Sequence, residues 1–267
     1  MGAEGLRRRI ALLLEYEGTA YAGSQLQGNA PTVQQAVEAA LRTLTGEDVR
    51  LALAGRTDAG VHAKGQVASF LTSREYPLDA FVHGLNAHLP EDIAVVEAAE
   101  VPLAFDVRRH ARGRWYRYTV LLRAGRPALL RRFAWHLRGP LDVEAMARAA
   151  ALFVGEHDFA SFTRPEMARR RTVRTVHTCR LRQRGPLLLL DMEANAFLPQ
   201  QVRRTVGALV EVGRGRLSPA EVEGLLRKPQ PGAARWAAPP HGLCLMRVYY
   251  DREIFGHALA EAQDLST

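Results

Sequence analysis

One carboxylate in this chain stands in a setting that suits chemistry. Asp58 lies in a short loop between Gly55 and Gly60, two residues after Arg56. An apolar run at residues 51–54 precedes the loop, and a strand-like run at 66–70 follows it. Glycines let another chain approach such a connection closely, and an Asp kept ionised by an Arg can act as a nucleophile. The alternative is a structural turn in which Asp58 caps backbone N–H groups, as most Asp residues in loops do.

The loop does not stand alone. Residues 54–63, Ala-Gly-Arg-Thr-Asp-Ala-Gly-Val-His-Ala, resemble the signature loop of the tRNA pseudouridine synthase A (TruA) family. Further segments agree in order with that family, at residues 16–21 with 32–34, 85–93, 114–118, 195–207 and 238–243. The resemblance runs from about residue 10 to about residue 250 and so covers nearly the whole chain. Two positions depart from the family: Ser24 stands where a Trp is usual, and Asp106 where a His is usual. We expect Ser24 to weaken local packing or a contact to the RNA.

The resemblance implies a particular reaction. Uracil is detached from ribose C1′, turned, and reattached through C5, so nothing is oxidised and no phosphate is cleaved. We therefore expect no cofactor and no metal, and the sequence contains no P-loop, no G-x-G-x-x-G and no His/Cys ligand cluster. By resemblance Asp58 is the catalytic nucleophile, and Arg203 is the cation that keeps it ionised in a site closed to water. The other interpretation of Arg203 is a phosphate contact like its neighbour Arg204.

A strand over 115–122 supplies the aromatic residues. Because side chains alternate along a strand, Arg114, Tyr116 and Tyr118 share one face and Trp115 and Arg117 share the other. The family's functional tyrosine matches Tyr116, and Tyr118 is the second candidate or a core residue. The target uridine must leave its stack. By resemblance Arg56 inserts where the base had been or holds the displaced strand.

The positive charge is concentrated. The formal net charge is +8, residues 108–138 hold ten Arg and no Asp or Glu, and residues 164–184 hold eight Arg and one acid, Glu166. Such an excess indicates binding of a polyanion. Aromatic residues within the first block favour a nucleic acid over a merely solvated surface. The run Arg169, Arg170 and Arg171 is the candidate contact to the tRNA backbone within the second block.

The pattern of elements predicts an α+β fold with the same order twice. Strands and helices over 10–15, 32–45, 49–54, 65–71, 78–88 and 93–98 give β-α-β-β-α-β. Residues 106–267 repeat this order with an extra strand over 133–137, expected to pair as a hairpin. We therefore predict two ferredoxin-like halves, 1–105 with the Asp58 loop and 106–267 with the basic surface. Their antiparallel sheets are expected side by side around a catalytic cleft.

Composition limits the remaining options. The chain has no apolar run near the roughly 20 residues that span a bilayer and no signal-peptide pattern, so we expect a cytoplasmic protein without membrane contact.

The resemblance implies a homodimer that binds the anticodon arm of tRNA, at positions 38, 39 and 40. Two alternatives remain. A non-catalytic RNA-binding protein leaves the carboxylate of Asp58 unexplained, and a glycosylase would usually need a second carboxylate that this loop lacks.

Overall fold

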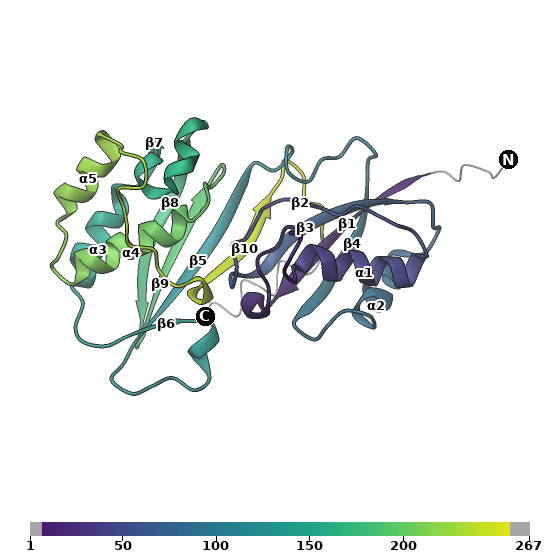
Figure 1. Ribbon diagram of the computed structural model, residues 1–267, viewed down its shortest axis with the longest axis horizontal. Helices are drawn as coiled ribbons and strands as arrows, with labels where there is room; N and C mark the ends of the chain where they lie inside the picture. The colour runs from purple at the N-terminus through teal and green to yellow at the C-terminus, as the bar shows by residue number, and fades with distance from the viewer. Residues whose placement is uncertain (1–6, 257–267) are drawn as a thin grey trace. The chain divides into compact units, whose positions relative to one another are not determined.

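The chain folds into two compact units. The computed structural model describes residues 7–256 (Figure 1). One unit comprises the described residues up to Arg112 together with those from Leu245 onward, and the other is Gly113–Cys244. The sequence predicts a boundary after residue 105 and a second half that keeps the last strand. The units instead divide after Arg112, and the last strand lies from Leu245 onward with the first unit, where it pairs with β3.

The first unit follows the predicted order of elements. Its sheet has the strand order β4-β1-β3-β10, with β2 also pairing with β3. Strand β1 runs antiparallel to both β3 and β4. The second strand is much shorter than the predicted run of 49–54. The elements are β1 (Arg8–Tyr16), α1 (Val33–Thr45), β2 (Ala52–Leu53), β3 (His62–Thr72), α2 (Leu78–Asn86), β4 (Ile93–Val101) and β10 (Leu243–Tyr249), with a 3-10 turn at Gly18–Ala20.

Local signals explain where helix α1 begins and ends. The hydroxyl of Thr32 accepts a hydrogen bond from the N–H of Gln35, which satisfies one of the free donors of the first turn. Gly46 ends the helix in the left-handed conformation, with φ of 71°. The strand β1 is buried at every position from Ile10 to Leu14, as expected for a strand covered on both faces.

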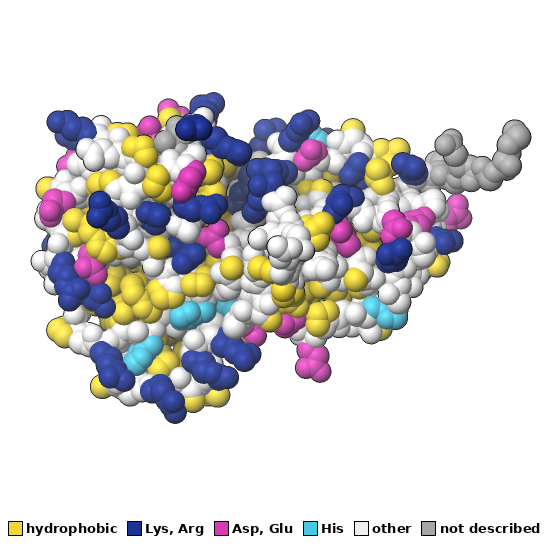
Figure 2. All heavy atoms as spheres, viewed as in Figure 1, with side chains coloured by type: hydrophobic (Ala, Val, Ile, Leu, Met, Phe, Trp, Pro, Cys, Tyr) yellow, Lys and Arg dark blue, Asp and Glu magenta, His cyan; other side chains and the backbone are white. Residues whose placement is uncertain are grey.

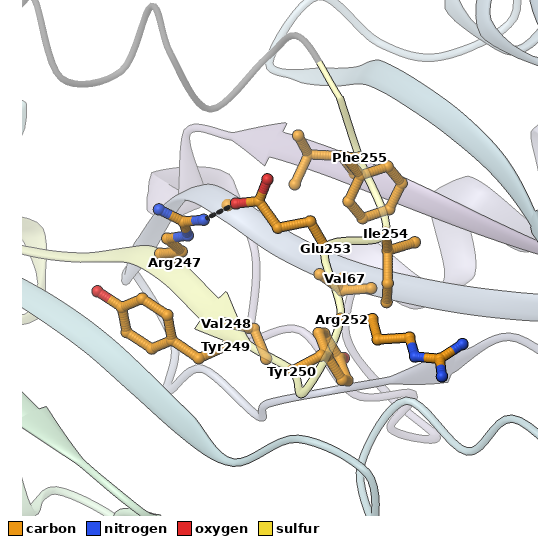
Figure 3. Close-up of a pocket in the computed structure, with 11 residues that line it drawn as sticks. Val67, Arg247, Val248, Tyr249, Tyr250, Arg252, Glu253, Ile254 and Phe255 are labelled. Atoms are coloured by element: carbon orange, nitrogen blue, oxygen red, sulfur yellow. Dashed lines mark hydrogen bonds and ion pairs between the residues drawn. The ribbon is translucent and has the colours of Figure 1, made fainter.

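The C-terminal segment covers part of the first sheet. Glu253 forms an ion pair with Arg247 of β10 at 2.6 Å, and the guanidinium of Arg247 lies over the ring of Tyr249 (Figure 3). Phe255 is buried, and it lines a small cavity of about 50 Å³ together with Val67 of β3. The first unit therefore takes in residues from both ends of the described chain.

The strands of the second unit follow the order β5-β9-β8-β7. Sequence signals locate two of its helices: Asp142 caps α3, and Ser218 with Glu221 forms the capping box of α5 after Pro219. The strand β7 and the 3-10 turns were not predicted. The elements are β5 (Gly113–Leu122), β6 (Trp135–Leu137), α3 (Val143–Ala151), β7 (Gly155–Asp158), β8 (Val173–Arg184), β9 (Leu187–Ala194), α4 (Gln201–Gly213) and α5 (Pro219–Arg227), with 3-10 turns at Leu130–Arg132, Ala160–Phe162, Pro165–Arg169 and Pro240–Gly242.

The extra strand β6 corrects one prediction. It pairs with β5 in parallel, with Val120 opposite Trp135 and Leu122 opposite Leu137, so it does not form a hairpin. Parallel pairing requires the chain to turn back along its partner before the second strand begins, here to the level of Val120. Residues 123–134 make that return, and they form an excursion beside the sheet (Figure 1).

An ionic cluster stabilises one face of the second sheet. Asp191 of β9 is 6% exposed and accepts hydrogen bonds from Arg117, Arg182 and the indole of Trp115. Burial works to raise the pKa of the Asp191 carboxyl, but the bonds from the two guanidiniums outweigh it and hold that pKa below its usual range.

No helix within residues 7–256 is long and apolar enough to cross a membrane.

Candidate active site

The Asp58 loop is held by a buried side-chain amide. Gln66 of β3 is fully buried; its Nε2 donates to the carbonyl of Gly55 at 2.7 Å, and its Oε1 accepts from the N–H of Gly55 at 3.2 Å. The amide thus satisfies both backbone groups of the residue at which the loop begins. The same Nε2 lies 3.4 Å from the hydroxyl of Tyr16. That hydroxyl is in turn 2.9 Å from Oγ1 of Thr57, next to Asp58.

A second contact fixes Thr57 from the other side. Ser24 is fully buried; its Oγ accepts from the N–H of Thr57 at 2.9 Å, and its own N–H donates to the carbonyl of Thr57 at 3.2 Å. Ser24 thus adds a bond that orients the loop, and its expected effect on packing or on a contact to the RNA stays a prediction. Gly23 has φ of 110°, and a Cβ there would lie 2.8 Å from the carbonyl oxygen of Thr57, so only glycine fits.

The carboxylate lies at the end of this framework. Asp58 is half-buried and Arg56 is exposed, and the carbonyl of Asp58 accepts from the N–H of Val61. Gly60 closes the turn with φ of 75° and donates its N–H to the carbonyl of Tyr21. The backbone on both sides of Asp58 is thus held by groups outside the loop, and Asp58 itself remains partly exposed.

His62, the histidine of this motif, is a structural residue. It is buried, and its Nδ1 accepts a hydrogen bond of 3.0 Å from the N–H of Gly18. A ring nitrogen that accepts a backbone N–H carries no proton. His62 therefore holds the chain at Gly18 close to the loop.

The alternation predicted along β5 is present in the second unit. Arg114, Tyr116 and Tyr118 are all buried, whereas Trp115 and Arg117 are half-buried. Arg114 donates to the carbonyl of Asn195 at 2.9 Å. Tyr116 meets the ring of Phe197 edge to face, with ring centres 5.1 Å apart.

Tyr118 serves the core of the second unit. Its side chain is fully buried, and its hydroxyl donates to the carbonyl of Pro239 at 2.8 Å. Burial raises the pKa of this hydroxyl far above its usual range, and the nearby charge of Arg203 opposes that shift in part. A ring that is fully buried offers no face to a substrate base, so Tyr116 is the better candidate for substrate contact.

The two arginines of α4 differ in what they touch. Arg203 donates from Nε to the carbonyl of Ala238 at 2.7 Å, and its own carbonyl accepts from the N–H of Ala238. The adjacent carbonyls of Ala238 and Pro239 thus bring Arg203 and Tyr118 together. Arg204 instead donates to the carbonyl of Ala234 and to Gln200. These bonds tie Arg204 to the segment around Ala234, and burial lowers the pKa of its guanidinium.

The remaining predicted contacts lie on the surface of the second unit. Arg169, Arg170 and Arg171 are exposed at the end of the 3-10 turn Pro165–Arg169. Within the described residues no group of three His, Cys, Asp or Glu side chains could hold a metal ion.

The comparison with known proteins identifies the family. The profile of the family described as tRNA pseudouridine synthase matches residues 13–108 and 149–251. The chain belongs to the tRNA pseudouridine synthase family. Its members are isomerases that act on uridine in tRNA. Relatives named tRNA pseudouridine synthase A include those of Geotalea uraniireducens (strain Rf4), 47% identical over 91% of this chain and 100% of the relative, and of Geobacter sp. (strain M21), 50% identical over 91% and 99%.

Sequence reasoning missed the residues that position the carboxylate of this synthase. Gln66, Tyr16 and Ser24 lie in three separate segments, and none carries a signal of its own. The departure at Ser24 was visible, but its bond to Thr57 depends on a fold that brings residues 24 and 57 together. At the other departure, Asp106 accepts from the N–H groups of Arg108 and Arg109, and so it caps a turn.

Proposed function

We propose that this synthase converts uridine to pseudouridine in the anticodon stem-loop of tRNA, at positions 38, 39 and 40, with Asp58 as the nucleophile. The observation that carries the proposal is the framework around Asp58. Gln66 holds the start of the loop and Ser24 holds Thr57, so the backbone is fixed on the approach to the carboxylate. A catalytic group must be held close to its productive geometry, and rigid support of this kind achieves that.

The reaction balances without any added reagent. The bond from C1′ to N1 breaks, a bond from C1′ to C5 forms, a proton leaves C5, and N1 ends with a proton. The electron pair of Asp58 assists the first step and is released at the end. Product and substrate have the same composition, so the reaction needs no oxidant or reductant.

The other roles complete the proposal. Arg203 is the cation that keeps Asp58 ionised, a role that its match to the family supports. Tyr116 offers its ring to the extruded base, with Arg114 behind it on the same strand face. Arg56 occupies the place that the base leaves, because it is exposed and two residues from Asp58. The exposed run of Arg169, Arg170 and Arg171 grips the backbone of the RNA.

We further propose two ferredoxin-like halves, a homodimer and a cytoplasmic location, where the tRNA is found. The order β-α-β-β-α-β of the first unit supports the first of these. Sedimentation of the purified protein tests the second, and fractionation of cells tests the third. A monomer at concentrations that give full activity would contradict the homodimer.

Release of tritium from C5-labelled uridine in tRNA tests the central proposal. The parent protein should release tritium, and mapping of the product should find pseudouridine at positions 38 to 40. Asp58→Asn should bind tRNA as the parent does but release less than about a hundredth as much, because loss of a nucleophile has effects well beyond that. A parent that binds tRNA without releasing tritium would instead support a non-catalytic RNA-binding protein.

A further inference from the structure

Hydrogen bonds from side chains to the backbone hold the excursion between β5 and β6. The guanidinium of Arg123 donates to the carbonyls of Gly125 and Arg126, and Arg131 donates to the carbonyl of Ala128 at 2.8 Å. Nε2 of His136 lies 2.8 Å from the carbonyl of Arg123, which closes the base of the excursion. These contacts give residues 123–136 a fixed form.

A cavity of about 620 Å³ lies against this excursion. Its walls come from the excursion and from the segment Pro239–His241 within the same unit. The volume falls within the range of roughly 300 to 1,000 Å³ that is usual for sites that bind small molecules and cofactors. Its lining includes Arg126, Arg131, Trp135, His136, Pro239 and His241.

The wall of the cavity is basic and aromatic. Arg126 and Arg131 are exposed, and no Asp or Glu is among the residues that line the cavity. Among residues 7–256, no hydrogen bond or ion pair engages the side chain of Arg126. Dark-blue and cyan side chains surround hydrophobic ones on the lower left of Figure 2, where Figure 1 places the excursion. A phosphate is the complement of such arginines.

Trp135 supplies a stacking surface. Its ring meets Tyr118 edge to face, with the planes at 85° and the centres 6.4 Å apart, so the indole is fixed from the core side. Trp135 is nevertheless only half-buried and lines the cavity. Bases of single-stranded RNA stack on aromatic side chains in this manner, and nearby arginines bind the backbone.

We propose that this cavity binds one nucleotide of the RNA substrate, other than the uridine that is isomerised. Its base stacks on Trp135, and its phosphate lies against Arg126 and Arg131. The cavity has no carboxylate in its wall, so it lacks the group that the isomerisation requires and serves binding alone. This inference rests on the proposed function only in taking tRNA as the RNA.

The test compares tRNA affinity and single-turnover rate in matched variants. Arg126→Ala, alone and with Arg131→Ala, removes charge from the cavity, and Trp135→Leu removes the stacking surface. The control is Arg148→Ala with Arg227→Ala, which removes the same charge from exposed positions of helices α3 and α5. Melting temperatures confirm that each variant is folded. Binding of uridine monophosphate alone, measured for the parent and for Trp135→Leu, separates a site for RNA from a site for free nucleotides.

The expected result is a loss of affinity specific to the cavity. Trp135→Leu should weaken tRNA binding at least about fivefold, because a stacked base contributes roughly that much or more. The double arginine variant should lower the salt dependence of binding by about one unit per lost phosphate contact. The control pair should bind as the parent does, and the rate from saturated complexes should stay unchanged in every variant.

Two results would overturn the inference. One is tRNA affinity equal to that of the parent in folded Trp135→Leu and in Arg126→Ala with Arg131→Ala. The other is uridine monophosphate binding that depends on Trp135 while tRNA binding does not, which would assign the cavity to a free nucleotide. The binding assay decides the matter even if the parent releases no tritium, so failure of the proposed function is a separate outcome.

Discussion

Replacing Gln66 by Leu should separate the positioning of Asp58 from the binding of tRNA. Leucine keeps a similar volume but removes both hydrogen bonds to Gly55. At about 1 kcal/mol for each neutral bond, the free energy of unfolding should fall by about 2 kcal/mol. Gly55 is half-buried, so water reaches its freed groups in part and the loss should not be larger.

The effect on rate should be greater than the effect on stability suggests. The loop that carries Asp58 loses its anchor, and a displacement of about 1 Å at a catalytic group can lower the rate about 100-fold. We expect single-turnover tritium release to fall between about 10-fold and 100-fold, with the dissociation constant of tRNA unchanged. Rapid-quench release and filter binding measure the two quantities.

Asn86 offers a matched control. Its side-chain amide bonds both the N–H and the carbonyl of Val95, at 2.7 and 2.9 Å, in the same unit but away from the Asp58 loop. Asn86→Leu should lower stability and leave the rate at the parent's value. If Gln66→Leu loses stability but isomerises as fast as the parent does, the position of Asp58 does not depend on this amide and the reasoning fails.

Three further outcomes follow from the structure. Asp191→Asn should lower the free energy of unfolding by about 3 kcal/mol near neutral pH, because it removes the buried carboxylate that pairs with the half-buried Arg117 and Arg182. The folded-state pKa of Asp191 lies below the unfolded value, so the loss of unfolding free energy should be full above about pH 4. It should shrink as the pH falls further, and urea unfolding measured at several pH values tests this. Tyr118→Phe should lower the free energy of unfolding by about 1 kcal/mol without changing the rate, whereas Tyr116→Ala should lower single-turnover tritium release. Equal rate losses in the two variants would contradict the assignment of Tyr116 to substrate contact and of Tyr118 to the core. Removing Arg169, Arg170 and Arg171 together should reduce the salt dependence of tRNA binding, and an unchanged dependence would count against phosphate contacts there.

The sequence predicts those features of this fold that local chemistry decides. The caps at Thr32, Asp142 and Ser218 are each a short-range bond between a side chain and a backbone N–H within one turn, so neighbouring residues suffice to predict them. The alternation of Arg114 and Tyr116 with their neighbours follows from the strand period alone.

Features that depend on distant contacts escaped prediction. The direction of β6 is decided by the path of residues 123–134, and a hairpin and a parallel return share the same short apolar run. The role of Gln66 depends on a register that places it beside Gly55 of another segment. A lone Gln between Gly65 and Val67 gives no sign of that contact.

The discontinuity of the first unit has a consequence for biosynthesis. The chain emerges from the ribosome from its N-terminus, so the whole of the second unit is made before the last strand and cover of the first. Until Leu245 and the residues after it are released, two surfaces of the first unit have no partner. One is the edge of β3 that pairs with β10, and the other is the side of Val67 that meets the C-terminal segment. Unpaired strand edges and bare apolar faces in nascent chains invite misassembly and chaperone binding. A premature stop late in the message would therefore damage the unit that contains Asp58, although that residue was translated long before.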